Sequence, residues 1–259
     1  GIDPAENLEK LAKKKGIKTF VNFFGTDKVD FGVKFDFITA MNVFAHVPDP
    51  LKFLIECKRN LNQDGKIVIQ TSQRDMVEER QFDTVYHEHI SFFSIKSMQA
   101  ICSRAGLYLN DIMLPEIHGK SYVFIISGND FQTDKLKERL EYEIKSGRYG
   151  NELYNSFQGS ILALKARLEE DLTSKTLVGF GAAAKGLVAL HSLGITPEVI
   201  IDENSLKIGK LIPKLNIPIV GLEELEKYEE DLDIIILAWN FYDEILQNLC
   251  DDLNTAKAF

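Results

Sequence analysis

The sequence predicts an α/β protein in which two units with parallel sheets are joined by helices. Strand-like and helix-like stretches alternate through the first half of the chain, a pattern typical of parallel sheets with helices on their faces. A second alternating series begins at the turn Gly179-Phe180-Gly181. Two helical patterns, at 133–145 and 152–172, separate the two series. The predicted domains are therefore 1–128, a helical connector at 129–173, and 174–259.

Composition sets limits on the class of protein. A length of 259 residues with 45% hydrophobic content allows one large domain or two moderate ones. The formal net charge of −9 argues against nucleic-acid binding, because no basic stripe is available to neutralise phosphates. Three scattered cysteines form no disulfide framework, and no apolar run reaches membrane-spanning length. We expect a cytoplasmic protein that binds neither nucleic acid nor membrane. The oligomeric state is not predicted.

The first half predicts its elements in a regular order. A first helix ends at Gly16, a typical helix stop. The turn Asp64-Gly65 is expected to separate a helix from the strand that follows it. Two later stretches, 108–113 and 121–127, are expected to add an antiparallel pair at the sheet edge. The remaining expectations are strands at 19–24, 35–42 and 66–71 and helices at 51–61 and 95–105.

Polar side chains in this half lie at the ends of predicted strands, where parallel sheets bind ligands. Asn42 and His46 lie at the end of the strand at 35–42. Asp3 has two interpretations: it accepts hydrogen bonds from ribose hydroxyls at a strand end, or it caps the helix that contains Glu6. We expect these side chains to line one cleft with the segment that follows the strand at 66–71.

The segment Tyr86-His87-Glu88-His89 brings a phenol, a carboxylate and two imidazoles into four residues. Histidine is the usual proton acceptor near pH 7. An extended segment would place Tyr86 and Glu88 on one face and the two histidines on the other, whereas a loop would allow all four to converge. The apolar run at 90–93 is expected to hold the segment against a core. The alternatives are surface histidines beside a glutamate, or metal ligands, although no paired Cys or His motif supports a metal.

In the second half, a strand runs into the pattern Gly-x-Gly-x-x-Ala at 179–184, and a helix is expected at 184–193. A strand that ends at Asp202 follows, which is the context that makes this fingerprint meaningful. Glycines let a diphosphate approach the backbone, amides at the helix start donate to it, and Lys185 adds a positive charge. Three interpretations stay open: an NAD-type dinucleotide site, a nucleotide-sugar diphosphate site, or a tight turn.

Trp239 and Asn240 follow a predicted buried strand at 233–237. The end of such a strand is a place where a ligand could be met. The alternative for Trp239 is a core aromatic residue. The pattern at 152–172 is amphipathic and is expected to pack against a core or to act as a strut between domains.

Several stretches of the chain are informative together: 1–4, 42–50, 86–94, 117–121, 179–186, 202–209, 217–219 and 238–244. In order and spacing they resemble the S-adenosylmethionine-dependent nucleotide-sugar C-methyltransferases, of the sugar C-3 methyltransferase type. The resemblance covers the chain almost continuously.

The resemblance implies a reaction and the residues that perform it. His89 would remove the proton from the carbon to be methylated, which lies next to a ketone of the sugar. Tyr86 and Glu88 would position the sugar or support that base, and His46 would line the same pocket. The deprotonated carbon would then accept the methyl group of S-adenosylmethionine. This chemistry requires no metal.

The resemblance also implies a partial class I methyltransferase sheet, which is Rossmann-like, in residues 1–128. Asp3 and Asn42 would belong to its S-adenosylmethionine site. Family members carry a zinc-binding amino-terminal domain and a glycine-rich cofactor loop ahead of the position of Asp3, and this sequence has neither. We therefore expect this chain to be a carboxy-terminal part of such an enzyme. We also expect that the chain alone binds S-adenosylmethionine weakly.

Residues 174–259 are implied to form a second Rossmann-like domain that binds a nucleotide-diphosphate sugar. The implied contacts are Gly179, Gly181, Lys185, His118, Asp202, Trp239 and Asn240. Two departures from the family affect them: Lys120 stands where a second glycine is expected after His118, and Pro213-Lys214 stands where Pro-Gly is usual. The alternative functions are a non-catalytic nucleotide-binding fragment and an NAD-dependent oxidoreductase domain.

Overall fold

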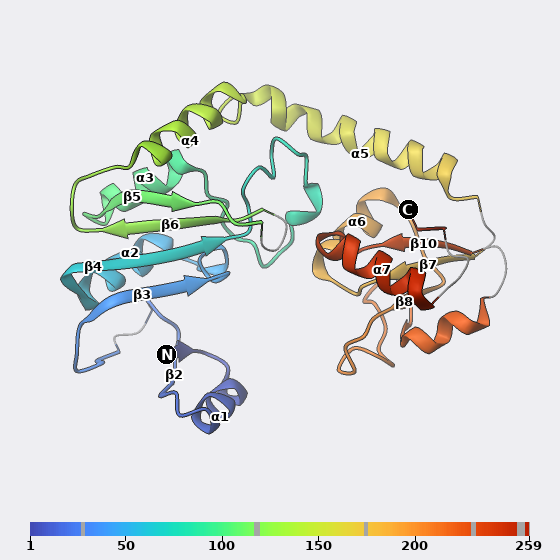
Figure 1. Ribbon diagram of the computed structural model, residues 1–259, viewed down its shortest axis with the longest axis horizontal. Coiled ribbons are helices and arrows are strands. Elements are labelled where there is room, and N and C mark those ends of the chain that lie inside the picture. Colours follow the sequence, from blue (N-terminus) through green and yellow to red (C-terminus); the bar gives the residue numbers. More distant parts are fainter. Residues whose placement is uncertain (27–28, 117–119, 174–175, 229–231, 253–256, 259) are drawn as a thin grey trace. The chain divides into compact units, whose positions relative to one another are not determined.

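The computed structural model describes residues 1–26, 29–116, 120–173, 176–228, 232–252 and 257–258 (Figure 1). The chain forms two compact units. The first contains Gly1–Asp75 and Glu88–Tyr149, and the second contains Met76–His87 and Gly150–Phe259. The chain therefore leaves the first unit after Asp75 and returns to it at Glu88.

The first unit is built on a four-stranded sheet in the order β3-β4-β6-β5. β3 (Phe35–Met41) and β4 (Leu61–Thr71) are parallel. β6 (Tyr122–Ser127) is antiparallel to β4, and β5 (Tyr108–Met113) is antiparallel to β6. The predicted antiparallel addition is therefore confirmed, with β5 as the outer strand of the described sheet.

The helices that accompany this sheet are α2 (Pro50–Asn60), α3 (Ile95–Arg104) and α4 (Asp134–Lys145). Each begins at a side chain that accepts a backbone hydrogen bond, namely Asp49, Ser94 and Thr133, and these caps satisfy amides that the helix itself leaves without partners. The apolar faces of α2 and α3 contribute to one core with the sheet. The helices expected at 51–61, 95–105 and 133–145 are confirmed.

A small element lies at the start of the chain. β1 (Ile2–Asp3) and β2 (Phe20–Val21) form a separate two-stranded parallel sheet around α1 (Glu6–Lys14). Gly16 adopts a φ of +74°, which confirms the predicted helix stop. The strand expected at 19–24 is shorter than predicted.

The predicted turn at Asp64-Gly65 is wrong. Both residues lie inside β4, where the pairing with β3 shifts register between Phe35 and Phe37. Asp64 and Gly65 therefore form an irregular stretch within the strand, and regular parallel pairing with β3 continues from Lys66 onward.

The second unit is built on a five-stranded sheet in the order β11-β10-β7-β8-β9, and all of its pairings are parallel. Strands of such sheets are apolar on both faces, as the buried Val178, Ile200 and Ile234 illustrate. The strands are β7 (Thr176–Phe180), β8 (Val199–Ile201), β9 (Ile219–Val220), β10 (Leu232–Ile236) and β11 (Lys257–Ala258).

The helices of this unit are α5 (Asn151–Asp171), α6 (Ala184–Leu193) and α7 (Tyr242–Asp252). The helices expected at 152–172 and 184–193 are confirmed. α5 buries none of its residues fully, although Leu168 packs against the core beneath α6. Short 3-10 helices are η1 (Phe44–His46), η2 (Phe82–Thr84), η3 (Leu222–Lys227) and η4 (Trp239–Phe241). In the described part of the chain, no helix has both the length and the apolar character needed to cross a membrane. With alternating helices and strands in both units, the α/β fold class is confirmed.

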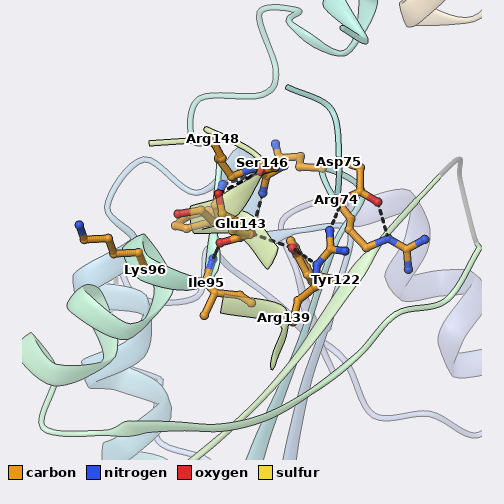
Figure 2. A network of polar contacts seen from close by, with 12 residues as sticks. Arg74, Asp75, Ile95, Lys96, Tyr122, Arg139, Glu143, Ser146 and Arg148 are labelled. Carbon is orange, nitrogen blue, oxygen red and sulfur yellow. Dashed lines mark hydrogen bonds and ion pairs between the residues drawn. The ribbon is translucent and has the colours of Figure 1, made fainter. Parts of the chain in front are cut away.

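A buried carboxylate joins several elements of the first unit (Figure 2). Glu143 on α4 is 0% exposed. It accepts hydrogen bonds from the Ile95 amide (3.0 Å), the Tyr122 hydroxyl (2.7 Å), the Arg148 guanidinium (2.7 Å) and the Tyr149 hydroxyl. Burial and the adjacent carboxylate raise the pKa of Tyr122, and they raise the pKa of Tyr149 to about 12. Both hydroxyls therefore remain donors at neutral pH.

The same network extends to the point where the chain leaves the first unit. Arg139 donates to the Tyr122 hydroxyl (2.9 Å) and to the Asp75 carboxylate. Arg74 pairs with Asp75 at 3.3 Å and with Glu116. Asp75 has a φ of +58°, an uncommon conformation for a residue other than glycine. Two guanidinium groups thus hold the carboxylate of the last residue before the crossing.

Replacing Glu143 with Gln is expected to lower the stability of the first unit by about 3 kcal/mol. The neutral amide removes the carboxylate charge that pairs with the buried Arg148 and places an NH₂ group among donors. The exchange of amide hydrogens in β6 and α4 measures this change locally.

The matched control is Glu138→Gln, because Glu138 lies on the same helix but is exposed. Equal exchange rates in the two variants would contradict a structural role for Glu143.

Candidate functional site

Two imidazoles lie side by side in the first unit. His46 is the last residue of η1, which follows β3. His89 lies two residues after His87, where the segment that belongs to the second unit ends. Their ring centroids are 5.1 Å apart with an interplanar angle of 55°. His89 is only 7% exposed, and the ring of Phe92 meets it edge-on at 6.1 Å. The structure therefore brings together two of the predicted catalytic residues, with one of them buried.

One carbonyl shapes the backbone that follows His89. The Ala45 oxygen accepts hydrogen bonds from both the Ile90 amide (2.9 Å) and the Ser91 amide (3.1 Å). Two consecutive amides that point at one oxygen do not form a strand ladder. The segment from 85 to 94 contains no strand, so the extended alternative for the motif is not adopted.

The side chain of Gln73 holds this segment from the end of β4. Gln73 is 1% exposed. Its amide nitrogen donates to the Ser91 carbonyl (3.0 Å), and its amide oxygen accepts from the Phe93 backbone amide (3.2 Å). One buried side chain thus satisfies a donor and an acceptor two residues apart, which fixes the backbone next to His89.

The apolar run after His89 is buried only in part. Phe93 is buried and packs on Phe44, with ring centroids 4.7 Å apart. Ile90 and Phe92 are 57% and 40% exposed. The expectation that the run holds the segment against a core is confirmed for Phe93 alone, since Ile90 and Phe92 face solvent.

The other residues of the motif are distributed differently. Tyr86 and His87 belong to the second unit, where they line a cavity of about 370 Å³ against α6. Glu88 is exposed and is the first residue of the return to the first unit. The four side chains are therefore not grouped in one unit.

The two residues predicted for the cofactor both lie in the first unit. Asp3 accepts a hydrogen bond from the Ala5 amide (2.8 Å), directly before α1. Asn42 adopts a φ of +53° at the end of β3, and its amide donates to the Gln70 carbonyl (3.2 Å). The side-chain oxygen of Asn42 is buried and has no hydrogen-bond partner among the described residues. A buried acceptor without a partner indicates a place where a ligand donor would fit.

His118 lies outside the described residues, so its predicted role has no structural counterpart here. The residues on either side of the gap contact Arg74: its backbone amide donates to the Lys120 carbonyl (3.1 Å), and its guanidinium meets Glu116.

The loop of the second unit is held together by its own hydrogen bonds. The Gly181 amide donates to the Ile201 carbonyl (2.7 Å), and the Ala183 amide donates to the Gly181 carbonyl (2.8 Å). Gly181 has a φ of +91°, and a Cβ there would lie 2.6 Å from the Cβ of Ala238. Glycine is therefore required at this position for both conformation and space.

Asp202 is the acid that follows the second strand of the fingerprint. Its carboxylate accepts from the Ala182 amide (2.8 Å), the Asn204 amide (2.8 Å) and the Lys207 ammonium (2.9 Å). Although burial raises the pKa of Asp202, the hydrogen bonds from Lys207 and the two amides outweigh it and lower the pKa. Asp202 therefore braces the loop as a carboxylate.

A cavity of about 340 Å³ opens beside this loop, at the carboxyl ends of β7, β8 and β10. This is the edge where parallel sheets bind ligands. Its lining includes Phe180, Gly181, Asp202, Ala238 and Phe241.

Lys185 contacts Trp239, and Trp239 in turn contacts Asp83, a residue that the sequence analysis did not single out. The Lys185 ammonium lies 4.6 Å from the centre of the Trp239 ring. The Trp239 indole nitrogen donates to the carboxylate of Asp83, which is 6% exposed. The Asn240 side-chain oxygen is buried without a partner in the described part of the chain.

The residues that sequence reasoning missed are Gln73, Glu143 and Asp83. Each acts through partners far away in the sequence, so no local spacing marks them. Among the described residues there is also no group of three or more His, Cys, Asp or Glu side chains that could hold a metal ion.

Comparisons with known proteins identify the family. The family "C-methyltransferase C-terminal domain" matches residues 116–257, and the family "Methyltransferase domain" matches residues 1–111. The chain belongs to the C-methyltransferase family. It is 28% identical to the C-methyltransferase NovU of Streptomyces niveus over 275 positions, which take in 100% of this chain and 65% of NovU.

More distant similarities concern single parts of the chain. The ubiquinone biosynthesis O-methyltransferase of Actinobacillus pleuropneumoniae is 34% identical over 86 residues, 29% of this chain and 37% of that protein. A solved SAM-dependent methyltransferase from Thermotoga maritima, a possible histamine N-methyltransferase, superposes with a TM-score of 0.40 at 19% identity. It covers 50% of this chain and 72% of that one. That superposition is too weak to support an argument. The chain spans less than two thirds of the length of these curated relatives, NovU and the O-methyltransferase.

Replacing Gln73 with Leu is expected to raise the exchange rate of the Phe93 amide hydrogen by about tenfold or more, because the buried amide loses its acceptor. Amide exchange followed by mass spectrometry or NMR measures the change. Gln63→Leu, at an exposed position of β4, is the control. An unchanged Phe93 rate would show that Gln73 does not hold the segment.

Replacing Gly181 with Ala is expected to destabilise the second unit by about 2 kcal/mol, through strain at positive φ and overlap with Ala238. Urea unfolding followed by the fluorescence of Trp239, the single tryptophan, reports on this unit.

Gly159→Ala serves as the control, because a Cβ at Gly159 on α5 meets nothing within 4 Å. If both variants unfold at the same urea concentration, the close approach at Gly181 is not a structural requirement.

Proposed function

We propose that this chain holds the proton-accepting base and the nucleotide-sugar site of a C-methyltransferase. The proposed reaction transfers a methyl group from S-adenosylmethionine to a carbon alpha to a ketone of a nucleotide-diphosphate deoxysugar. The observation that carries the proposal is the buried His89 beside His46, within a chain of the C-methyltransferase family.

The chemistry requires a base at the sugar. A carbon next to a ketone becomes nucleophilic when it loses a proton, because the carbonyl oxygen takes up the charge as an enolate. His89 is the proposed acceptor of that proton. Its low exposure and the edge of Phe92 limit the access of water. The Ala45 carbonyl and the Gln73 side chain hold the backbone of the residues that follow it. Preorganisation of this kind is what a proton-transfer step needs.

Tyr86, Glu88 and His46 are proposed to position the sugar around the base. The phenol and the carboxylate are the hydrogen-bonding groups that flank His89 in the motif. The proximity of His46 to His89 supports a place in the same pocket.

S-adenosylmethionine is the proposed cofactor, and it supplies the methyl group when bound. Asn42 offers a buried carbonyl oxygen without a partner in the described chain, which fits a ligand that carries hydroxyl or amino donors. Asp3 would accept hydrogen bonds from the ribose while its other contact, the Ala5 amide, keeps the carboxylate oriented.

The nucleotide diphosphate is proposed to bind at the first turn of α6, beside the 340 Å³ cavity of the second unit. The amides of Gly181, Ala182 and Ala183 are already used within the loop. The donors left for a diphosphate are therefore those of the first turn of α6, where a helix favours anions. The functional domains 1–128, 129–173 and 174–259 are part of this proposal, as are the substrate contacts of Gly179, Lys185, Trp239 and Asn240.

An NAD-dependent oxidoreductase is the alternative that the loop motif leaves open. In dinucleotide-binding domains the acid after the second strand accepts hydrogen bonds from the ribose. Here Asp202 already accepts from three donors of its own unit. This use of the acid favours a loop brace over a ribose contact, and it weakens the oxidoreductase interpretation.

The deciding experiment measures deuterium uptake from heavy water into a nucleotide-linked 4-keto-6-deoxysugar, without S-adenosylmethionine. This step needs only the sugar site and the base. Replacing His89 with Ala is expected to slow uptake by about 10²-fold or more. His89→Gln should be equally slow, because glutamine is polar but has no basic nitrogen.

Uptake that survives both substitutions would remove His89 from the mechanism. Sugar binding without uptake in the parent chain would instead support the non-catalytic nucleotide-binding fragment.

A further inference from the structure

The segment Met76–His87 is an insertion from the first unit's sequence into the second unit. It leaves after β4 and carries η2, which packs on α6. Asp83 is the central residue of η2, and its carboxylate is 6% exposed. A carboxylate buried to this extent needs compensating partners.

Two residues of the second unit supply them. The indole nitrogen of Trp239 donates a hydrogen bond to the Asp83 carboxylate. The ammonium of Lys185 lies 4.6 Å from the centre of the same indole ring. That ammonium is buried and has no hydrogen-bond partner within the described chain. We call these three residues the Asp83 latch.

The charges of the latch compensate each other. Burial raises the pKa of the Asp83 carboxyl, and the hydrogen bond from Trp239 and the charge of Lys185 oppose that rise. Burial lowers the pKa of the Lys185 ammonium, and the charge of Asp83 opposes that fall. Removal of one partner therefore leaves the other as a poorly compensated buried charge.

The latch lies between the 340 Å³ cavity and the 370 Å³ cavity of the second unit along the chain segments that line them. Lys185 is in the first turn of α6, directly after the loop that contains Gly181. Trp239 follows Ala238, which lines the 340 Å³ cavity. Asp83 stands three residues before Tyr86, which lines the other cavity of α6.

We infer that Asp83 is a positioning residue that fastens the inserted segment to the helix start beside the nucleotide cavity. The latch sets the place of Tyr86 against α6 and fixes the segment from which the chain runs on to His89. Its effect on catalysis rests on the proposed function, whereas its existence does not.

The latch has a built-in reporter. Trp239 is the only tryptophan of the chain, so intrinsic fluorescence reads its surroundings directly. In the chain without any ligand, Asp83→Ala is expected to shift the Trp239 emission. It is also expected to speed amide exchange at 82–87 and in the first turn of α6 by at least about tenfold. Asp83→Asn retains an oxygen that accepts from the indole but removes the charge that compensates Lys185. It should therefore keep an emission close to that of the parent, while exchange in the first turn of α6 stays faster than in the parent.

Asp243→Ala is the matched control, since it removes an exposed carboxylate four residues from Trp239. The latch is overturned if Asp83→Ala leaves emission and exchange as they are in the parent and in Asp243→Ala. Should Asp83→Ala fail to fold, Asp83→Asn decides. Exchange in the first turn of α6 that is at least about twofold faster than in the parent and in Asp243→Ala supports the latch, and parent-like exchange there overturns it.

The positioning role is tested separately with the deuterium-uptake assay. Asp83→Ala is expected to lower kcat by at least about tenfold, a larger factor than any accompanying change in KM for the nucleotide-linked sugar. A parent-like kcat in Asp83→Ala overturns the positioning role. If the parent chain itself shows no uptake, the proposed function fails, while the ligand-free fluorescence and exchange data still decide the latch.

Discussion

The first unit depends on one buried carboxylate. Glu143 receives donors from the start of α3, from β6 and from the turn after α4, so a single side chain fixes three elements at one point. Its charge is tolerated because Arg148 is buried beside it. The bond to the Ile95 amide holds the start of α3, where the segment that follows His89 ends.

The chain crosses between the two units three times, and the excursion formed by the first two crossings, Met76–His87, is held by polar contacts rather than by a strand or helix of the main sheets. Asp75 is paired with Arg139 where the chain leaves, and Gln73 and the Ala45 carbonyl hold it after its return. In between, Asp83 is bound to Trp239. The motif with the tyrosine and the histidines lies between these anchors. Backbone outside regular structure needs such partners, because its donors and acceptors have no ladder to satisfy them.

The sequence predicted what local patterns encode. Helical spacing places α2, α3 and α6 within a residue or two, since the signal lies inside each element. It could not predict that Asp64 and Gly65 lie inside a strand, because pairing with β3 decides that. Nor could it find the bond between Asp83 and Trp239, whose residues are 156 positions apart. The family's motif located His46 and His89 but gave no sign that Tyr86 belongs to the other unit.

The fingerprint of the second unit shows how far a motif carries chemistry. Its glycine geometry is present, as the φ of +91° at Gly181 demonstrates. Its acid is also present, yet the Asp202 carboxylate already accepts hydrogen bonds from Ala182, Asn204 and Lys207. With the loop amides used internally, an anion would have to approach the first turn of α6. Lys185 lies in that turn, but its ammonium is held beneath Trp239 near Asp83. The free energy of binding a diphosphate there is therefore linked to the state of the inserted segment, because any movement of Lys185 toward the anion weakens its compensation of Asp83.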